Sequence, residues 1–183
     1  MANERITEEL VRAHFRDDPL FKSIRLEEQR SMNRAVTRLL SSASKTGGRG
    51  RGLPEFLITF PSDSRYLIVI ECKASVSCHE SPGRDRPAEY AVDGVLRYAS
   101  ALSAEYDVIA IAVSGESETE LRVSQFQWVK GASACVPLSD SALLSVNSYL
   151  RLFANEQFEE NLRTTDIVQK AIELNEEYNA YSI

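Results

Sequence analysis

The sequence has none of the features that mark membrane or secreted proteins. No apolar run approaches the roughly 18 residues that a membrane span requires, and the first residues lack the apolar stretch of a secretory signal. Only 3 cysteines and 2 histidines occur, and their spacing suits neither a zinc site nor a set of disulfides. We therefore expect a cytoplasmic protein with reduced thiols and no membrane contact.

Internal repeats and low-complexity segments are absent too. The 183 residues, of which 43% are hydrophobic, suffice for one buried core. We expect a single domain over residues 1–155, with its core at 25–138.

The charge of the chain is unevenly distributed. The net charge of -6 argues against a protein that grips nucleic acid over its whole surface. Residues 22–51, however, hold eight basic residues and two acids, a local net charge of +6, whereas residues 156–183 hold seven acids and two basic residues, a local net charge of -5. One end of the chain can therefore face DNA while the other faces solvent or another domain.

The apolar spacing predicts alternating helices and strands. Two helices come first, then a hairpin, a third helix, three strands and two last helices, in the order 4–15, 25–44, 56–60 with 66–73, 88–104, 107–114, 121–129, 134–138, 139–153 and 165–178. This order predicts an α/β fold with a central mixed sheet flanked by helices.

The helix expected over residues 25–44 carries an apolar stripe. Its members recur at spacings of three and four: Met32, Ala35, Val36, Leu39, Leu40 and Ala43. Glu28 falls one turn before this stripe and is expected to point inward. The opposite face holds Arg30, Arg34 and Arg38, which form either a solvated face or a stripe that contacts phosphates.

The hairpin brings two acids together. If its loop is symmetric about Asp63, the numbers of facing residues add up to about 126, which places Glu55 beside Glu71. Because side chains alternate along a strand, Glu71 and Lys73 share one face, and Cys72 points to the other.

Two carboxylates on neighbouring strands repel one another unless a cation lies between them. Glu55 and Glu71 are therefore candidate Mg²⁺ ligands, with the main-chain carbonyl of Cys72 and with Glu28, directly or through a water, completing the shell. Lys73 is placed to orient or deprotonate an attacking water. A Glu-x-Lys sequence on a strand is more often a solvated ion pair, but the apolar run 66–70 predicts a strand buried on both faces.

These residues resemble the PD-(D/E)XK nuclease superfamily, with Pro54-Glu55 at the first motif and Glu71-Cys72-Lys73 at the second. The likeness spans about residues 25–115. It implies a restriction-endonuclease-like fold and DNA hydrolysis that depends on Mg²⁺, for which Mn²⁺ can substitute. Glu55 and Glu71 would be metal ligands, Lys73 would position water, and Glu28 would match an acid on the preceding helix. The family usually has aspartate where Glu55 stands, so the side chain here is longer by one methylene.

Residues 91–99 and 107–115 are similar to the N-terminal nuclease domain of type IIG-like restriction-modification polypeptides, in which the nuclease is fused to an N6-adenine methyltransferase. This resemblance implies double-stranded DNA as partner, methyltransferase and target-recognition regions in the same parent chain, and a dimer for double-strand cleavage. Residues 156–183 would then be a helical connector to a further domain. The superfamily resemblance further implies polar residues that approach the site from the helix after the second motif, which Asp93, Arg97 or Tyr98 would supply. Arg97 and Tyr98 are also candidate DNA-binding residues.

The glycine-rich segment 47–52 lacks the ending of a nucleotide-binding loop. Arg49 and Arg51 either contact DNA phosphates or belong to a plain mobile loop. Cys78-His79-Glu80 is expected to be a loop rather than a catalytic pair. Two other functions stay open: a nuclease-like module that only binds DNA or protein, and a nuclease of DNA repair or transposition.

Overall fold

The computed structural model describes residues 3–43 and 53–155, and the chain divides into two compact units, Met1–Val146 and Asn147–Ile183. The first unit holds the sheet and all of the site discussed below. The second unit is helical up to residue 155, where its description ends. Arg49, Arg51 and the expected connector over 156–183 lie outside the described residues.

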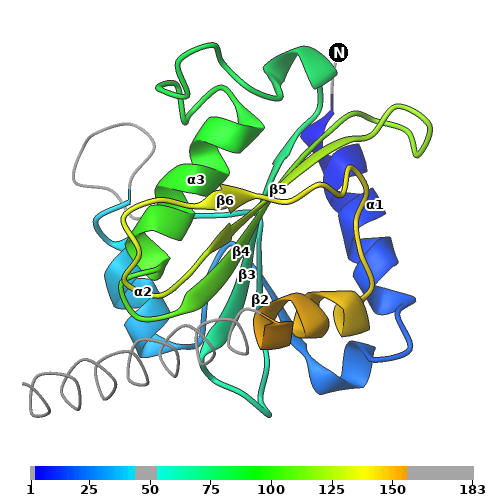
Figure 1. Ribbon diagram of the computed structural model, residues 1–183. Helices are drawn as coiled ribbons and strands as arrows, with labels where there is room; N and C mark the ends of the chain where they lie inside the picture. Colours follow the sequence, from blue (N-terminus) through cyan, green and yellow to red (C-terminus); the bar gives the residue numbers. More distant parts are fainter. Residues whose placement is uncertain (1–2, 44–52, 156–183) are drawn as a thin grey trace, which may run out of the picture. The chain divides into compact units, whose positions relative to one another are not determined.

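One six-stranded sheet forms the first unit, with its strands in sequence order (Figure 1). Its strands are β1 (Arg25–Glu28), β2 (Phe56–Thr59), β3 (Tyr66–Lys73), β4 (Asp107–Ser114), β5 (Arg122–Trp128) and β6 (Val136–Pro137). Only β3 and β4 run parallel, and every other neighbouring pair is antiparallel. The expected mixed α/β class with a sheet flanked by helices is confirmed.

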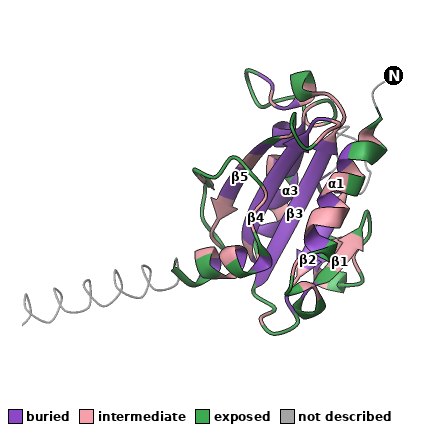
Figure 2. Cartoon of the chain, turned by 90° about the vertical axis from the view of Figure 1, so that its right-hand side faces the viewer, coloured by how far each residue is buried: buried purple, intermediate pink, exposed green. Residues whose placement is uncertain are grey.

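Helices cover both faces of this sheet. They are α1 (Glu4–Arg16), α2 (Arg34–Leu40) and α3 (Ala91–Leu102), with single 3₁₀ turns η1 (Phe21–Ser23) and η2 (Val76–Cys78). The ribbon shows α1 on one face and α2 with α3 on the other. The central strands β3 and β4 are consequently buried along most of their length (Figure 2), as their unbroken apolar runs predict. Within the described residues, no helix is long and apolar enough to cross a membrane.

The hairpin of β2 and β3 has the predicted register. Phe56 pairs with Ile70 and Leu57 with Val69, so the numbers of facing residues add up to 126. The turn is closed by a hydrogen bond of 3.0 Å from the Asp63 amide to the Phe60 carbonyl. Glu55, one residue before β2, therefore lies beside the end of β3 that carries Glu71.

The helix expected over residues 25–44 is wrong for its first half. Residues 25–28 are the edge strand β1, which pairs with β2 from Arg25 opposite Thr59 to Glu28 opposite Phe56. Gln29 then adopts a φ of 56°, which ends the strand, and α2 begins only after Asn33, whose side chain accepts from the amides of Ala35 and Val36. Met32 is 89% exposed and belongs to no core stripe.

Within residues 3–43 and 53–155, the other elements follow the prediction with shifted ends, whereas the helix expected over 165–178 lies outside the described residues. The first helix is confirmed and is capped by Asn3. The helix expected from residue 139 begins only at residue 146, because the preceding segment is irregular.

Candidate metal centre

The end of β3 places a carboxylate under helix α3. Glu71 is fully buried, at 0% exposure. A Cβ atom on Gly94 would lie 3.3 Å from Cγ of Glu71 and 2.9 Å from the carbonyl oxygen of Pro87. A residue without a side chain is thus needed at position 94, since the Glu71 carboxylate occupies the space that a side chain there would fill.

The start of α1 supplies a second acid, Glu4, and is fixed to the sheet. The Thr7 hydroxyl donates to the Gly115 carbonyl over 2.7 Å, and the Asn3 amide donates to Oε1 of Glu116 over 2.6 Å. Both acceptors follow β4 directly. Glu4 is therefore held at the end of the sheet where β3 and β4 finish.

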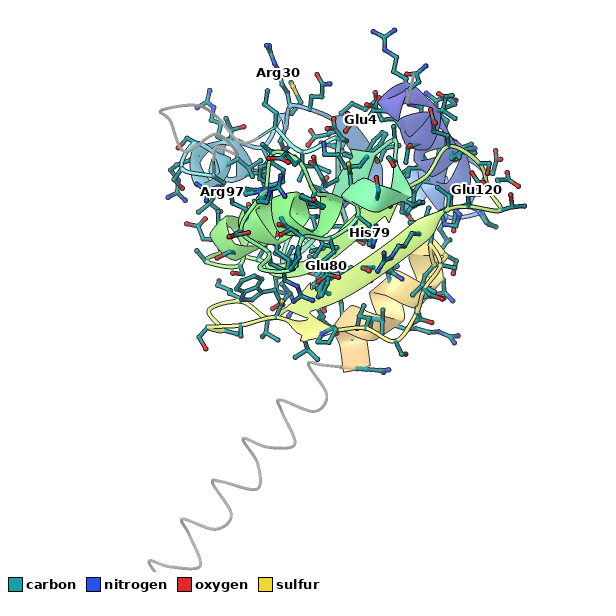
Figure 3. All side chains as sticks on the ribbon, turned by 90° about the horizontal axis from the view of Figure 1, so that it is seen from above. Glu4, Arg30, His79, Glu80, Arg97 and Glu120 are labelled. Atoms are coloured by element: carbon teal, nitrogen blue, oxygen red, sulfur yellow. The ribbon has the colours of Figure 1, made fainter. Side chains whose placement is uncertain are left out.

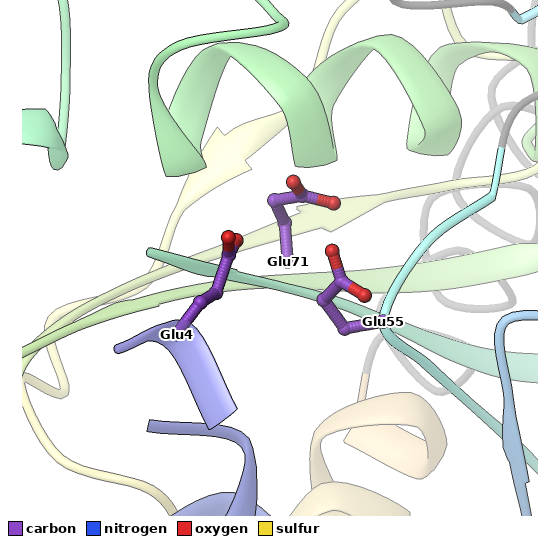
Figure 4. Close-up of side chains that lie close together, drawn as sticks. All are labelled: Glu4, Glu55 and Glu71. Carbon is purple, nitrogen blue, oxygen red and sulfur yellow. The ribbon is translucent and has the colours of Figure 1, made fainter. Parts of the chain in front are cut away.

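Glu4, Glu55 and Glu71 form one cluster, with a carboxylate oxygen from each within 4.8 Å of the others. Figure 4 shows the three side chains pointing toward one another from α1, the start of β2 and β3. Nζ of Lys73 lies 2.8 Å from Oε1 of Glu4 and 3.2 Å from Oε1 of Glu71. These four side chains, three anionic and one cationic, leave a net charge of -2.

The cluster changes the protonation of its neighbours. Burial alone lowers the pKa of Lys73, but the charges of Glu71 and Glu4 and the hydrogen bonds to them outweigh burial, so that its pKa is raised. Burial raises the pKa of the Cys72 thiol, and the charge of Glu71 raises it further. Lys73 consequently stays a cation and a hydrogen-bond donor, and Cys72 stays a neutral thiol packed in the core, as expected.

Glu28 does not join the cluster, contrary to expectation. It lies on the edge strand, and its two carboxylate oxygens accept from Arg12 at 2.8 Å and 2.9 Å. Arg12 also lies over the ring of Phe56, 5.5 Å from its centroid. The hydrogen bonds from Arg12 lower the pKa of Glu28. Glu28 therefore forms an ion pair between α1 and the sheet. The third carboxylate of the cluster comes from Glu4 instead.

The sequence does not predict Glu4 as a member of the site, because an acid at this position has a simpler explanation. An acid in the first turn of a helix is stabilised by the helix dipole wherever the helix lies. Nothing in the sequence around Glu4 shows that this helix start meets the ends of β3 and β4, because the hydrogen bonds that fix it join residues more than 100 positions apart.

The three polar residues of α3 expected near the site differ in their exposure. Arg97 is exposed, whereas Tyr98 is only 1% exposed, so its side chain offers no surface to DNA, contrary to expectation. Burial raises the pKa of Tyr98, with the charge of Glu71 as the next cause. Asp93 is buried and accepts hydrogen bonds from the amides of Ser81 and Arg86. Its carboxylate therefore fixes the loop before α3 and does not point to the cluster as a ligand would.

His79 ties that loop to the sheet. Its ring is buried, with Nδ1 2.7 Å from the Ser114 hydroxyl and Nε2 2.8 Å from the Ser124 hydroxyl. Its carbonyl accepts from the amide of Val92, in the first turn of α3, over 2.8 Å. His79 thus joins β4, β5 and α3, a structural role that its sequence neighbours Cys78 and Glu80 do not indicate.

No protein-family model matches the chain, and neither a curated protein nor a solved structure matches it. What this site can do is therefore inferred from its own atoms.

Proposed function

We propose that the chain is a DNA endonuclease domain that depends on Mg²⁺. Glu4, Glu55 and Glu71 would hold the cation, and Lys73 would position the attacking water. The observation that supports this most directly is the convergence of three carboxylates within 4.8 Å around a buried Glu71, with Lys73 in hydrogen-bond contact.

The donor set suits the ion. The three side chains offer only carboxylate oxygens, which are the ligands that Mg²⁺ and Mn²⁺ prefer over nitrogen or sulfur. The net charge of -2 that remains beside Lys73 is also what one divalent cation neutralises. The main-chain carbonyl of Cys72 is a further oxygen at the same end of β3. When bound, the cation supplies charge neutralisation at a phosphoryl oxygen and lowers the pKa of a bound water.

The protein residues have distinct tasks in this proposal. Glu71, Glu55 and Glu4 would fix the position of the cation and orient the water bound to it. Lys73, whose Nζ contacts both Glu4 and Glu71, would donate hydrogen bonds that orient the attacking water and the phosphate. Helix α3 closes the site over Glu71 at Gly94 and limits the access of bulk water there.

The wider setting that we propose is a restriction system. The domain would be the cleavage module of a longer polypeptide whose methyltransferase and target-recognition regions supply sequence specificity. Two copies would be needed to cut both strands of a duplex. A nuclease of repair or transposition would use the same site chemistry and differ only in its DNA substrate.

Plasmid cleavage tests the proposal. Supercoiled plasmid is incubated with Mg²⁺ and either the wild type or Glu71→Gln, with Glu120→Gln as a control that removes an exposed acid elsewhere. We expect nicked or linear product from the wild type and the control, and none from Glu71→Gln. If the wild type binds the plasmid but leaves it intact with Mg²⁺ and with Mn²⁺, the alternative of a passive binding module is favoured.

A further inference from the structure

Arg30 lies directly beside the metal-binding end of β2. Gln29, the first residue after β1, donates its amide hydrogen to the carbonyl of Glu55 over 3.2 Å. Arg30 comes next, and its amide donates to the Glu28 carbonyl over 2.6 Å. The chain turns sharply here, because Gln29 has a φ of 56°. Arg30 is therefore exposed at the edge of the cluster on the Glu55 side.

Arg97 lies on α3, the helix that covers Glu71. It is three residues after Gly94 on α3, which places both on neighbouring turns of one helix face. Gly94 is the residue whose missing side chain makes room for Glu71. Arg97 is exposed, so its guanidinium extends into solvent about one helical turn from the buried carboxylate.

Several arginines of the described residues are already engaged by carboxylates. Arg12, Arg38, Arg84 and Arg86 each form an ion pair with a glutamate. Within residues 3–43 and 53–155, neither Arg30 nor Arg97 forms one. A phosphate can therefore bind either arginine without displacing a carboxylate of the described residues.

The opposite flank of the cluster is acidic. The turn between β4 and β5 carries Glu116, Glu118 and Glu120, and the Asn3 amide bonds this turn to the start of α1. Figure 3, which looks onto this end of the molecule, places Arg30 and Arg97 to one side of Glu4 and Glu120 to the other. A polyanion that approaches the cluster is attracted on the first side and repelled on the second.

We propose that the backbone of the DNA substrate crosses the site on the side of α2 and α3, with Arg30 and Arg97 binding phosphates on either side of the cleaved one. The duplex then avoids the flank formed by α1 and the turn between β4 and β5. This inference rests on the proposed nuclease function and adds to it the direction from which the substrate enters.

Salt-dependent DNA binding tests the direction separately from cleavage. The binding of a fluorescent duplex is measured by anisotropy in EDTA, where no metal-dependent hydrolysis occurs, for the wild type, Arg30→Ala and Arg97→Ala. Two matched controls remove one cation each: Arg5→Ala, next to Glu4 on the α1 flank, and Lys22→Ala. Lys22 precedes β1, whose first residue pairs with Thr59 at the end of β2 away from Glu55.

The slope of log affinity against log salt is negative, and each site variant is expected to reduce its magnitude by about 1. The affinity should fall roughly 8-fold at about 0.1 M salt, as the loss of one phosphate contact predicts. The controls should keep the wild-type slope. The inference is overturned if the wild type does not bind duplex at low salt, or if Arg5→Ala loses as much affinity as Arg30→Ala and Arg97→Ala. If the arginine pattern holds but Mg²⁺ produces no cleavage, the proposed function fails and the binding path stands.

Discussion

Nζ of Lys73, at the end of β3, lies 2.8 Å from Oε1 of Glu4, in the first turn of α1. This contact joins the N-terminal helix to the end of the sheet that carries the carboxylate cluster, across 69 positions of sequence. It also means that Lys73 neutralises part of a carboxylate cluster that otherwise repels itself. In the proposed metal site, the lysine and the divalent cation would therefore act on the same negative charge.

Replacing Lys73 with methionine should make the fold depend on divalent cations. Removing the ammonium takes away the cation that contacts both the buried Glu71 and Glu4, so we expect a loss of about 3 kcal/mol in the free energy of unfolding in EDTA. Mg²⁺ should then raise the melting temperature of the variant more than that of the wild type, because the cation replaces the lost charge. Thermal unfolding with and without Mg²⁺ measures this. If Mg²⁺ raises the melting temperatures of the two proteins equally, the claim that Lys73 and the cation offset the same negative charge is contradicted.

Glu28→Gln should leave cleavage unchanged. Its carboxylate is bound by Arg12 and is 47% exposed, so it contributes an ion pair and no metal ligand. We expect a stability loss of only about 0.5–1 kcal/mol, since an exposed pair is screened by solvent. Chemical denaturation and plasmid cleavage measured on the same preparation check both points. A loss of activity as large as that of Glu71→Gln would return Glu28 to the metal site.

Gly94→Ala should lower both stability and activity. Alanine favours a helix over glycine by about 0.5–1 kcal/mol, but the new Cβ would lie 2.9 Å from the Pro87 carbonyl and 3.3 Å from Cγ of Glu71. Overpacking of this kind costs about 1–3 kcal/mol, so the steric effect wins. The measurements are the denaturation midpoint and the cleavage rate, with Ser100→Ala at an exposed position of α3 as control. A variant that is more stable than the wild type would show that the space beside Glu71 is larger than described.

Acid should destabilise the fold through His79. Burial, with the charge of Arg122 as the next cause, lowers its pKa from 6.5 to about 4. Between these two pH values the unfolded chain binds the proton and the folded chain does not, so stability is complete above about pH 6.5 and falls as pH decreases toward 4. The shift corresponds to at most roughly 3 kcal/mol.

The free energy of unfolding, measured from pH 7 to pH 4, tests this effect. His79→Gln keeps polar atoms that can face Ser114 and Ser124 but has no titrating group, so its stability should depend less on pH in this range. Equal slopes for the wild type and the variant would assign the acid sensitivity to other groups.

The hairpin shows how much the sequence can predict. Two apolar runs around a loop centred on Asp63 fix the strand register, and the register alone places Glu55 beside Glu71. This geometry is local, because it depends on residues within about twenty positions. The burial of β3 and β4 likewise follows from the apolar runs themselves.

The region before the hairpin shows where such reasoning ends. The helical spacing around α2 is real, but it was extended back over Arg25 to Glu28, where pairing with β2 overrides local helix preference. That error placed Glu28 on a helix and among the expected metal ligands. Glu4 has no local signal of its role, since its position depends on the contacts of Asn3 and Thr7 with residues after β4.

The dependence of the cleavage rate on Mg²⁺ concentration in Glu4→Gln tests most directly whether Glu4, Glu55 and Glu71 form a metal site for cleavage. Loss of one carboxylate ligand should raise the Mg²⁺ concentration needed for half-maximal cleavage by roughly 10- to 100-fold or abolish cleavage, while Glu9→Gln on the same helix keeps the wild-type dependence. A Glu4→Gln variant with unchanged Mg²⁺ dependence, or a wild type that cuts no DNA with any divalent cation, would contradict the account.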